Sequence, residues 1–281
     1  MTAAKPESTH ALIVGGDSSI GQAVATAAQS RGWTHTRTSR RANHNSGAVS
    51  LDLSDHTSLK ALRFPPPPCR VFLLAAVTSL RTCEQRPEAT GKINAAAVAF
   101  LAERAAHAGA TPTLVSTNLV FDGTHARVPP NAPRHPQTAY GKQKASAEDA
   151  VLQAGGVVVR PTKVLPPEPP MLAVWRDALR RGERVEAFTD LWFAPVPIST
   201  VIDALLDAPP GIRHVSGRHD ISYYEAAQHI AQQVNADPAL VVAAKAADVG
   251  IPTPQRPRHT TLACDEPYSP WDVLDQALSL G

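Results

Sequence analysis

Short apolar segments alternate with helical patterns through the first 160 residues, and this alternation limits the folds open to the chain. Strands are predicted at 11–14, 33–38, 49–53, 71–76, 113–116 and 157–159. Helices are predicted at 19–31, 93–108 and 139–154, where apolar or alanine-rich positions recur along the segment. Because the strand segments show no polar alternation, we expect a parallel sheet covered by helices on both faces. The sequence therefore predicts an α/β fold with a doubly wound parallel sheet.

The regular alternation weakens after Pro161, which indicates a second and smaller region. The segment 165–170 (LPPEPP) predicts a linker, and a helix is expected at 171–181. We expect 199–207 and 212–215 to return to the main sheet as a helix and a strand. The predicted organisation is a dinucleotide-binding domain over 1–161, with its sheet completed by 199–217, and a small C-terminal substrate lobe over 162–281 interleaved with it.

Composition excludes several classes of protein. Of the 281 residues, 43% are hydrophobic and 19% are charged, which predicts a folded chain with a sizeable core. The net charge of +2 argues against a nucleic-acid partner. The three cysteines, Cys69, Cys83 and Cys264, and the 11 histidines show no metal-ligand spacing, so we expect reduced thiols, no metal and a cytoplasmic location. The first ten residues lack an apolar signal segment, so neither secretion nor membrane insertion is expected.

A glycine-rich segment follows the first predicted strand and opens the first predicted helix. Glycines at such a turn let the backbone approach a pyrophosphate, and the N-terminus of the helix supplies free N–H groups. The segment predicts a Rossmann cofactor site, although an ordinary strand-to-helix turn is the alternative. The candidate cofactor-binding residues are Gly15, Asp17, Ser18, Ser19, Ile20 and Gly21.

Ser39, Arg40 and Arg41 close the second predicted strand. A carboxylate at this position binds the ribose 2′-hydroxyl of NAD, whereas arginine favours the 2′-phosphate of NADP. No acidic residue follows until Asp52, so we predict NADP(H) as the cofactor. The alternative interpretation is a solvated basic turn.

Tyr140 and Lys144 are four residues apart in the predicted helix 139–154 and therefore share one face. A phenol of ordinary pKa is a poor acid–base catalyst at neutral pH. A nearby ammonium, together with the positive nicotinamide of an oxidised cofactor, is expected to lower the pKa of the Tyr140 phenol. Such a pair also arises by chance. Thr117 follows the strand 113–116 and could orient a substrate carbonyl, or simply satisfy backbone groups at the strand end.

Trp192 and Phe193 lie in a segment bounded by proline, without a clear helical or strand period. An aromatic face can stack on a nucleotide base or a sugar, so both residues are candidate substrate-binding residues. A hydrophobic plug within the smaller lobe is an equally good interpretation.

Taken together, these motifs resemble the extended short-chain dehydrogenases/reductases, and within them the dTDP-4-dehydrorhamnose reductase-like sugar-nucleotide reductases. That family carries a serine–threonine–aspartate–tyrosine–valine–phenylalanine–aspartate–glycine segment, which residues 116–123 match at six of eight places. The resemblance covers about residues 11–260. It also rests on Ala75-Ala76-Val77-Thr78, Cys83-Glu84, Asn94, Tyr140 with Lys144, Arg160-Pro161 and Arg256-Pro257.

The resemblance implies a reductase that acts on a keto group of a nucleotide-activated sugar, with Tyr140 as proton donor, Lys144 on the nicotinamide ribose and Thr117 on the carbonyl. It implies a homodimer. It adds cofactor contacts at Asp52, Leu53, Ala75, Ala76, Val77 and Asn94, and substrate contacts at Thr78 and Asn118. Asn94 could sit near the cofactor or a proton-relay water, or be a polar residue at a helix N-terminus.

Three departures from the family pattern stand out. Ser18 replaces the middle glycine of the glycine-rich motif, Asn118 and Leu119 replace aspartate and tyrosine, and the 165–170 and 192–193 segments are unusual. Two alternatives remain open. One is an epimerase or dehydratase of the same fold. The other is a non-catalytic binding protein, comparable to the regulatory beta subunit of methionine adenosyltransferase.

Overall fold

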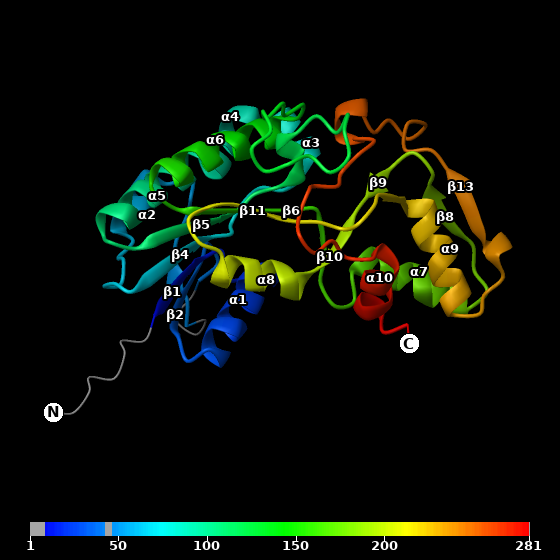
Figure 1. Cartoon of the computed structure of the whole chain (residues 1–281), viewed down its shortest axis with the longest axis horizontal. Helices are drawn as coiled ribbons and strands as arrows, with labels where there is room; N and C mark the ends of the chain where they lie inside the picture. The colour runs from blue at the N-terminus through cyan, green and yellow to red at the C-terminus, as the bar shows by residue number, and fades with distance from the viewer. Residues whose placement is uncertain (1–8, 43–46, 281) are drawn as a thin grey trace. The chain divides into compact units, whose positions relative to one another are not determined.

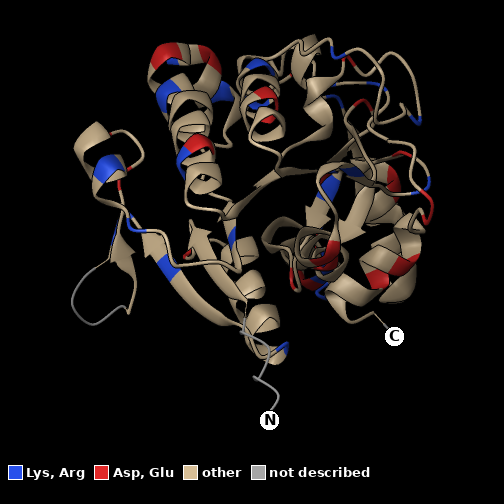
Figure 2. Cartoon of the chain, turned by 60° about the vertical axis from the view of Figure 1, so that its left-hand side comes forward, with Lys and Arg blue, Asp and Glu red and all other residues tan. Residues whose placement is uncertain are grey.

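The computed structural model describes residues 9–42 and 47–280. Residues 1–8, on which the expectation of no signal segment depends, lie outside the described residues. Among the described residues, no helix combines the length and apolar composition needed to cross a membrane. Residues of both charge signs are distributed along the helices and loops (Figure 2).

A seven-stranded sheet forms the centre of the first part of the chain, in the order β11-β6-β5-β4-β1-β2-β3. Its pairings from β6 to β3 are parallel. Figure 1 shows helices on both faces, with α5 and α6 on one side and α1 and α8 on the other. The predicted doubly wound α/β fold is confirmed. The strands are β1 (His10–Val14), β2 (Thr34–Ser39), β3 (Val49–Ser50), β4 (Cys69–Leu73), β5 (Thr111–Val115), β6 (Val157–Pro161) and β11 (Gly211–Val215).

The helices of this part include several that the sequence patterns did not predict. The expected helix 93–108 is divided into a π-helical turn, η1, and α5. The short helices α2, α3 and α4 fall in segments without a clear apolar period. The full set is α1 (Ser19–Ser30), α2 (His56–Ala61), α3 (Leu80–Gln85), α4 (Pro87–Gly91), η1 (Lys92–Ala96), α5 (Ala97–His107), α6 (Ala139–Gln153) and α8 (Ile198–Asp207).

The chain forms two compact units. The first comprises the described residues up to Ser116, together with Ala139–Val159 and Ile202–Arg213. The second comprises Thr117–Thr138, Arg160–Val201 and the described residues from His214 onward. Residues 117–138, which the sequence-based division placed in the first domain, therefore group with the second unit.

Three two-stranded sheets and three longer helices build the second unit, around a core that includes Phe193, Ile221 and Leu274. Strand β7 pairs with β10, β9 with β12, and β8 with β13. The elements are η2 (Asn118–Val120), β7 (Lys163–Leu165), α7 (Pro170–Arg180), β8 (Val185–Phe188), β9 (Trp192–Phe193), β10 (Pro195–Pro197), β12 (Ile221–Ser222), α9 (Tyr223–Gln233), η3 (Pro238–Leu240), β13 (Val241–Ala244), η4 (Thr253–Gln255) and α10 (Pro270–Leu278).

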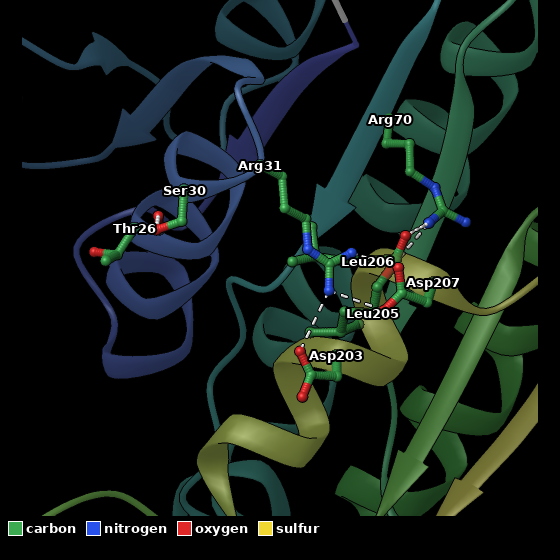
Figure 3. A network of polar contacts seen from close by, with 8 residues as sticks. All are labelled: Thr26, Ser30, Arg31, Arg70, Asp203, Leu205, Leu206 and Asp207. Atoms are coloured by element: carbon green, nitrogen blue, oxygen red, sulfur yellow. Dashed lines mark hydrogen bonds and ion pairs between the residues drawn. The ribbon is translucent and has the colours of Figure 1, made fainter.

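Two arginines attach the C-terminal half of α8 to the rest of the first unit (Figure 3). Arg31, which follows α1, forms ion pairs with Asp203 and Asp207. Arg70 of β4 donates hydrogen bonds to the carbonyl oxygens of Leu205, Leu206 and Ala208, at 3.3 Å for the first and 2.7 Å for the last. The last carbonyl groups of a helix lack donors within the helix. The Arg70 guanidinium supplies N–H donors to these carbonyl groups at the end of α8.

Candidate functional site

The turn between β1 and α1 is too tight for side chains at three of its positions. Gly15 has a φ of +91°, and a Cβ atom there would lie 2.7 Å from the backbone nitrogen of Ala75. A Cβ atom on Gly21 would lie 2.2 Å from the Gly15 carbonyl oxygen, and one on Gly16 would lie 2.6 Å from the Cβ atom of Arg37. The segment therefore requires glycine at these three positions for reasons of space.

Ser18, which stands where the family pattern has glycine, is the N-cap of α1. Its hydroxyl donates to the Gly15 carbonyl at 2.8 Å and accepts from the Gly21 N–H at 3.0 Å. The N–H groups of Ser19 and Ile20 belong to the first turn, where a helix has no acceptors of its own, and that turn holds no acidic residue. This bare turn at a helix N-terminus fits a pyrophosphate.

The end of β2 is hydrogen-bonded to the glycine-rich turn. Ser39 donates from its hydroxyl to the Oδ2 atom of Asp17 at 3.0 Å and accepts from the N–H of Arg41 at 3.0 Å. The side chains of Arg40 and Arg41 are exposed. Beyond β3, Asp52 accepts hydrogen bonds from the N–H and hydroxyl of Ser54, which lower the pKa of the Asp52 carboxyl, and the charge of Arg40 lowers it further.

Asn94 links the loop after β4 to α6. Its amide accepts from the Val77 N–H at 2.8 Å and donates to the Val77 carbonyl at 2.9 Å. It also donates to the Oε1 atom of Gln143 at 2.8 Å, and Gln143 in turn donates to Thr90. Asn94 is fully buried in the π-helical turn η1 rather than at the start of a helix. The Asn94 side chain therefore holds the Val77 backbone next to Gln143, the residue before Lys144 in α6.

These contacts bring several predicted cofactor-binding residues into one connected set in the first unit. The glycine-rich turn touches the end of β2 and the loop at Ala75, and Asn94 connects that loop to α6. Leu53, like Asp52, lies just beyond β3, Ala76 lies within the loop, and Thr78 is exposed two residues further on. The carboxyl ends of adjacent parallel strands are the usual place for a ligand in such a sheet.

Tyr140 lies in the first turn of α6, and a carboxylate fixes the start of that helix. Glu84 of α3 accepts a hydrogen bond from the N–H of Ala139 at 2.8 Å. An acceptor at this position satisfies one of the unpaired N–H groups and complements the helix dipole. Glu84 belongs to the Cys83-Glu84 pair of the family pattern. Its hydrogen bond to Ala139 fixes the backbone next to Tyr140.

The pKa of Tyr140 differs from the sequence-based expectation. Burial, assisted by the neighbouring Cys83 thiol, raises the pKa of the Tyr140 phenol to about 12. The expected lowering of this pKa by Lys144 is not found, because removal from water disfavours the phenolate. The Tyr140 phenol is therefore protonated at neutral pH.

Lys144 is buried one helical turn beyond Tyr140. Burial lowers the pKa of the Lys144 ammonium to about 8, and the charge of Glu148 opposes that change. Glu148 is itself fully buried and accepts a hydrogen bond from the hydroxyl of Ser116. The sequence analysis did not single out Glu148, although its i+4 spacing from Lys144 was a visible signal.

Thr117 is the first residue of the second unit and the N-cap of η2. Its hydroxyl accepts from the N–H of Leu119 at 3.2 Å and lies 3.4 Å from the Oδ1 atom of Asn118. The side chain is 9% exposed. The local backbone role that the sequence analysis gave as an alternative is thus present, and the hydroxyl donates to the Oδ1 atom of Asn118.

Motif residues of the second unit hold each other in place. Arg160 is 1% exposed, donates to the carbonyl of Pro130 at 3.0 Å, and lies over the ring of Phe121 at 5.2 Å. A Cβ atom on Gly123, which has a φ of +72°, would lie 2.3 Å from the Cβ atom of Pro257. The segments 116–123, 160–161 and 256–257 therefore meet in three dimensions, and much of the family pattern in this unit records packing.

Trp192 and Phe193 have different surroundings within β9. Phe193 is 4% exposed in the core of the second unit, with its ring centroid 4.5 Å from that of Tyr223. That position agrees with the plug interpretation. Trp192 is half-buried and has the Arg258 guanidinium 4.0 Å above its ring. Because Trp192 is only half-buried and Phe193 is in the core, Trp192 is the better candidate for a substrate contact.

Asp190, next to this segment, was missed by the sequence analysis and binds a distant loop. Its carboxylate accepts from the N–H groups of Ala246 and Ala247 and pairs with Arg256 at 2.7 Å. Burial opposes ionisation, but these contacts outweigh it and lower the pKa of the carboxyl. Arg256 of the family's Arg-Pro pair is therefore a structural partner of Asp190.

No cluster of three His, Cys, Asp or Glu side chains suited to a metal ion exists among residues 9–42 and 47–280. The three cysteines are free thiols, and Cys69 and Cys83 are buried.

Comparison with known proteins identifies the family. The family model described as the RmlD substrate binding domain matches residues 9–269. The chain is 33% identical over 155 residues to methionine adenosyltransferase 2 subunit beta of Xenopus laevis, an alignment that covers 54% of this chain and 46% of that relative. The chain therefore spans less than half the length of this first relative.

A second curated relative and a solved structure are both named dTDP-4-dehydrorhamnose reductase. The chain is 28% identical over 199 residues to dTDP-4-dehydrorhamnose reductase of Mycobacterium tuberculosis, which covers 66% of each chain. It superimposes on the dTDP-4-dehydrorhamnose reductase of Bacillus anthracis in complex with NADP with a TM-score of 0.81, covering 96% of this chain and 99% of the other. The sequence identity to the Bacillus anthracis protein is 16%, so this similarity concerns the fold alone.

Proposed function

This chain belongs to the RmlD substrate binding domain family, and on that premise we propose that it is an NADPH-dependent reductase of a keto group on a nucleotide-activated sugar. The observation that carries the proposal is the start of α6, which Glu84 fixes and where the half-buried Tyr140 lies one turn before the buried Lys144. A phenol held in its protonated form, with an ammonium one turn away, suits proton donation to a carbonyl oxygen.

The residues of the first unit fit the cofactor that the proposal requires. The glycine-rich turn has no room for side chains at Gly15, Gly16 and Gly21, and it offers the N–H groups of Ser19 and Ile20 to a pyrophosphate. The exposed guanidinium groups of Arg40 and Arg41 suit a 2′-phosphate. Bound NADPH would supply the hydride. The curated reductase relative and the NADP-bound structural neighbour support this choice.

The three catalytic residues have different proposed roles. Tyr140 donates its phenolic proton to the carbonyl oxygen as the carbonyl is reduced to an alcohol. Lys144 binds the nicotinamide ribose and stabilises the phenolate that Tyr140 leaves behind. The Thr117 hydroxyl donates a hydrogen bond to the same carbonyl oxygen. Thr78, Asn118 and Trp192 are the proposed substrate contacts, whereas Phe193 is buried in the core of the second unit.

A screen of nucleotide sugars tests the proposal. Purified protein is incubated with NADPH and each 4-keto nucleotide sugar in turn, NADPH consumption is followed at its absorbance band, and products are identified by mass spectrometry. We expect consumption coupled to an alcohol product with at least one substrate, and none with the Tyr140→Phe variant. Tightly bound oxidised cofactor in the purified protein, with an isomerised product, would favour an epimerase instead.

A second candidate function follows from the 33% identity to methionine adenosyltransferase 2 subunit beta. In this proposal the chain binds NADP(H) without turnover and acts through a partner protein. If no nucleotide sugar is reduced while NADP⁺ still binds, this candidate replaces the first.

We also propose that the protein is a cytoplasmic homodimer. The free thiols suit a reducing compartment. Light scattering on the purified full chain tests the dimer, since a monomer mass at working concentration would contradict it.

A further inference from the structure

Three polar side chains are buried together where α6 packs against β5. Ser116, which follows β5, is 4% exposed and donates its hydroxyl to the Oε1 atom of Glu148. Glu148 is 0% exposed, and Lys144, one helical turn earlier, is 3% exposed. A buried carboxylate and a buried ammonium thus occupy consecutive turns of one helix, and a strand-end hydroxyl fixes the carboxylate.

The environment of Lys144 works against its charge. Burial disfavours an ammonium because the surrounding protein replaces its hydration poorly. Glu148 is the charged group that acts in the opposite direction. Glu84 and Cys83 of α3 act at Ala139 and Tyr140. The polar side chains buried next to α6 are Thr90 of α4, Asn94 of η1 and Ser116 after β5, whereas Glu88 of α4 and Lys92 of η1 are exposed. Helix α5 also packs against α6, and its buried residues are apolar. Its Glu103 and His107 are exposed, and its Arg104 donates to the carbonyls of Leu59 and Leu62.

We propose that Glu148 is a positioning residue whose carboxylate, fixed by Ser116, keeps Lys144 in its ammonium form in a buried setting. The use of that charge, to bind a cofactor and stabilise a phenolate, rests on the proposed function. The charge itself is a property of the protein alone and can be measured without cofactor. A role for Glu148 in helix packing only would leave the titration of Lys144 unchanged.

Nuclear magnetic resonance of the full chain with ¹³C-labelled lysine measures this titration directly. The Cε resonance of Lys144 is assigned by its loss in Lys144→Met. We expect its midpoint near pH 8 in the wild type and a fall of about 1 pH unit or more in Glu148→Gln, which is nearly isosteric but neutral. Ser116→Ala should lower the midpoint less, and Glu148→Asp should restore part of the shift. An unchanged midpoint in Glu148→Gln overturns the proposal.

A matched control separates a local effect from a change in net charge. Asp149→Asn removes one negative charge from the adjacent and exposed position of the same helix, and the midpoint of Lys144 should stay where it was. If Asp149→Asn shifts it as far as Glu148→Gln does, the proposal is wrong. Should Glu148→Gln fail to fold, the wild-type carboxyl carbon of Glu148 provides the test, since its resonance must move at the pH where Lys144 loses its proton. A flat carboxyl resonance there overturns the proposal.

Calorimetric titration with NADP⁺ connects this charge to binding. Because the Lys144 pKa is lowered, the ammonium is lost as pH rises through its midpoint, and NADP⁺ affinity should fall there. In Glu148→Gln the fall should begin at a lower pH, by the same shift as the lysine resonance. Binding that falls at the same pH in both proteins contradicts the proposal. If the wild type binds no NADP⁺ at any pH, the proposed function fails, and the lysine resonance still decides the role of Glu148.

Discussion

Buried polar side chains serve different purposes in the two compact units. In the first, Lys144 is buried beside a single opposing charge, and its pKa is moved toward neutrality. In the second, the buried Arg160 contacts a carbonyl acceptor and an aromatic ring, and the partly buried Arg256 contacts a carbonyl oxygen and the Asp190 carboxylate. Both kinds of residue contribute to the same family pattern. Membership of a motif therefore does not separate residues that perform chemistry from residues that hold a segment in place, whereas the contacts of each side chain do.

The largest effect should come from Tyr140→Phe. The change removes one oxygen and keeps the ring, so the free energy of unfolding should barely change. Turnover of the true substrate should fall by ~10²–10⁴-fold, the usual contribution of a positioned acid. Steady-state kinetics and thermal unfolding measure the two quantities. Near-normal turnover would mean that the pair of Tyr140 and Lys144 is a chance match. The polar residues of the first unit would then not differ in purpose from those of the second.

In the second unit, Arg160→Met should lower the free energy of unfolding, which Tyr140→Phe should leave nearly unchanged. It removes the donor to the Pro130 carbonyl and the stacking partner of Phe121, which leaves buried polar atoms without a partner. We expect the free energy of unfolding to fall by about 2–4 kcal/mol, measured by urea titration. The exposed Arg180→Met on α7 is the control and should change stability by less than about 0.5 kcal/mol. A stable Arg160→Met protein that has lost only turnover would place Arg160 among the catalytic residues.

The next effect concerns the exposed arginines at the end of β2. Arg40→Ala combined with Arg41→Ala should weaken NADPH binding by about tenfold to a hundredfold and leave NADH binding nearly unchanged, because the lost contacts are to a phosphate. Calorimetry with both cofactors measures this. The exposed Arg63→Ala serves as the control for net charge. Equal weakening of NADPH and NADH would show that the basic turn is only a solvated surface.

The smallest effect is expected at Trp192. Trp192→Ala removes the ring beneath Arg258, which should cost stability only about 0.5–1 kcal/mol. Substrate KM should rise more than the Kd of NADPH, and Trp192→Phe should recover most of the loss because it keeps an aromatic face. If Trp192→Ala unfolds the protein, Trp192 belongs with Phe193 in the core, and the plug interpretation applies to both.

The sequence was most informative where apolar periods are long and bounded by glycine. The predictions for α1, α6 and β6 differ from the structure by two residues or fewer at each end. Strand β4 was predicted two residues late, since its first residues, Cys69 and Arg70, interrupt the apolar pattern. Helix α9 was missed despite the pairing of Ser222 with Glu225 at its start, a recognisable helix-initiation signal.

The candidate site was harder to predict because its polar contacts join distant parts of the chain. The spacing of Tyr140 and Lys144 is local and was visible. The bond between Glu84 and Ala139 spans 55 positions, and that between Asn94 and Gln143 spans 49. No local pattern encodes such pairs. Likewise, the sequence shows Ser18 only as a departure from the glycine motif, whereas in the structure its hydroxyl bonds the Gly15 carbonyl and the Gly21 N–H.

The late arrival of α8 and β11 has a consequence for synthesis on the ribosome. Strand β6 acquires its outer neighbour only when residues 211–215 have been made, and Arg31 and Arg70 acquire their partners only when residues 203–208 have been made. Until then the nascent chain carries an apolar strand edge, Val157 to Val159, of the kind that recruits other chains. Expression of a fragment ending at Pro161 would freeze that intermediate, and we expect it to be found in inclusion bodies while the whole chain is recovered folded.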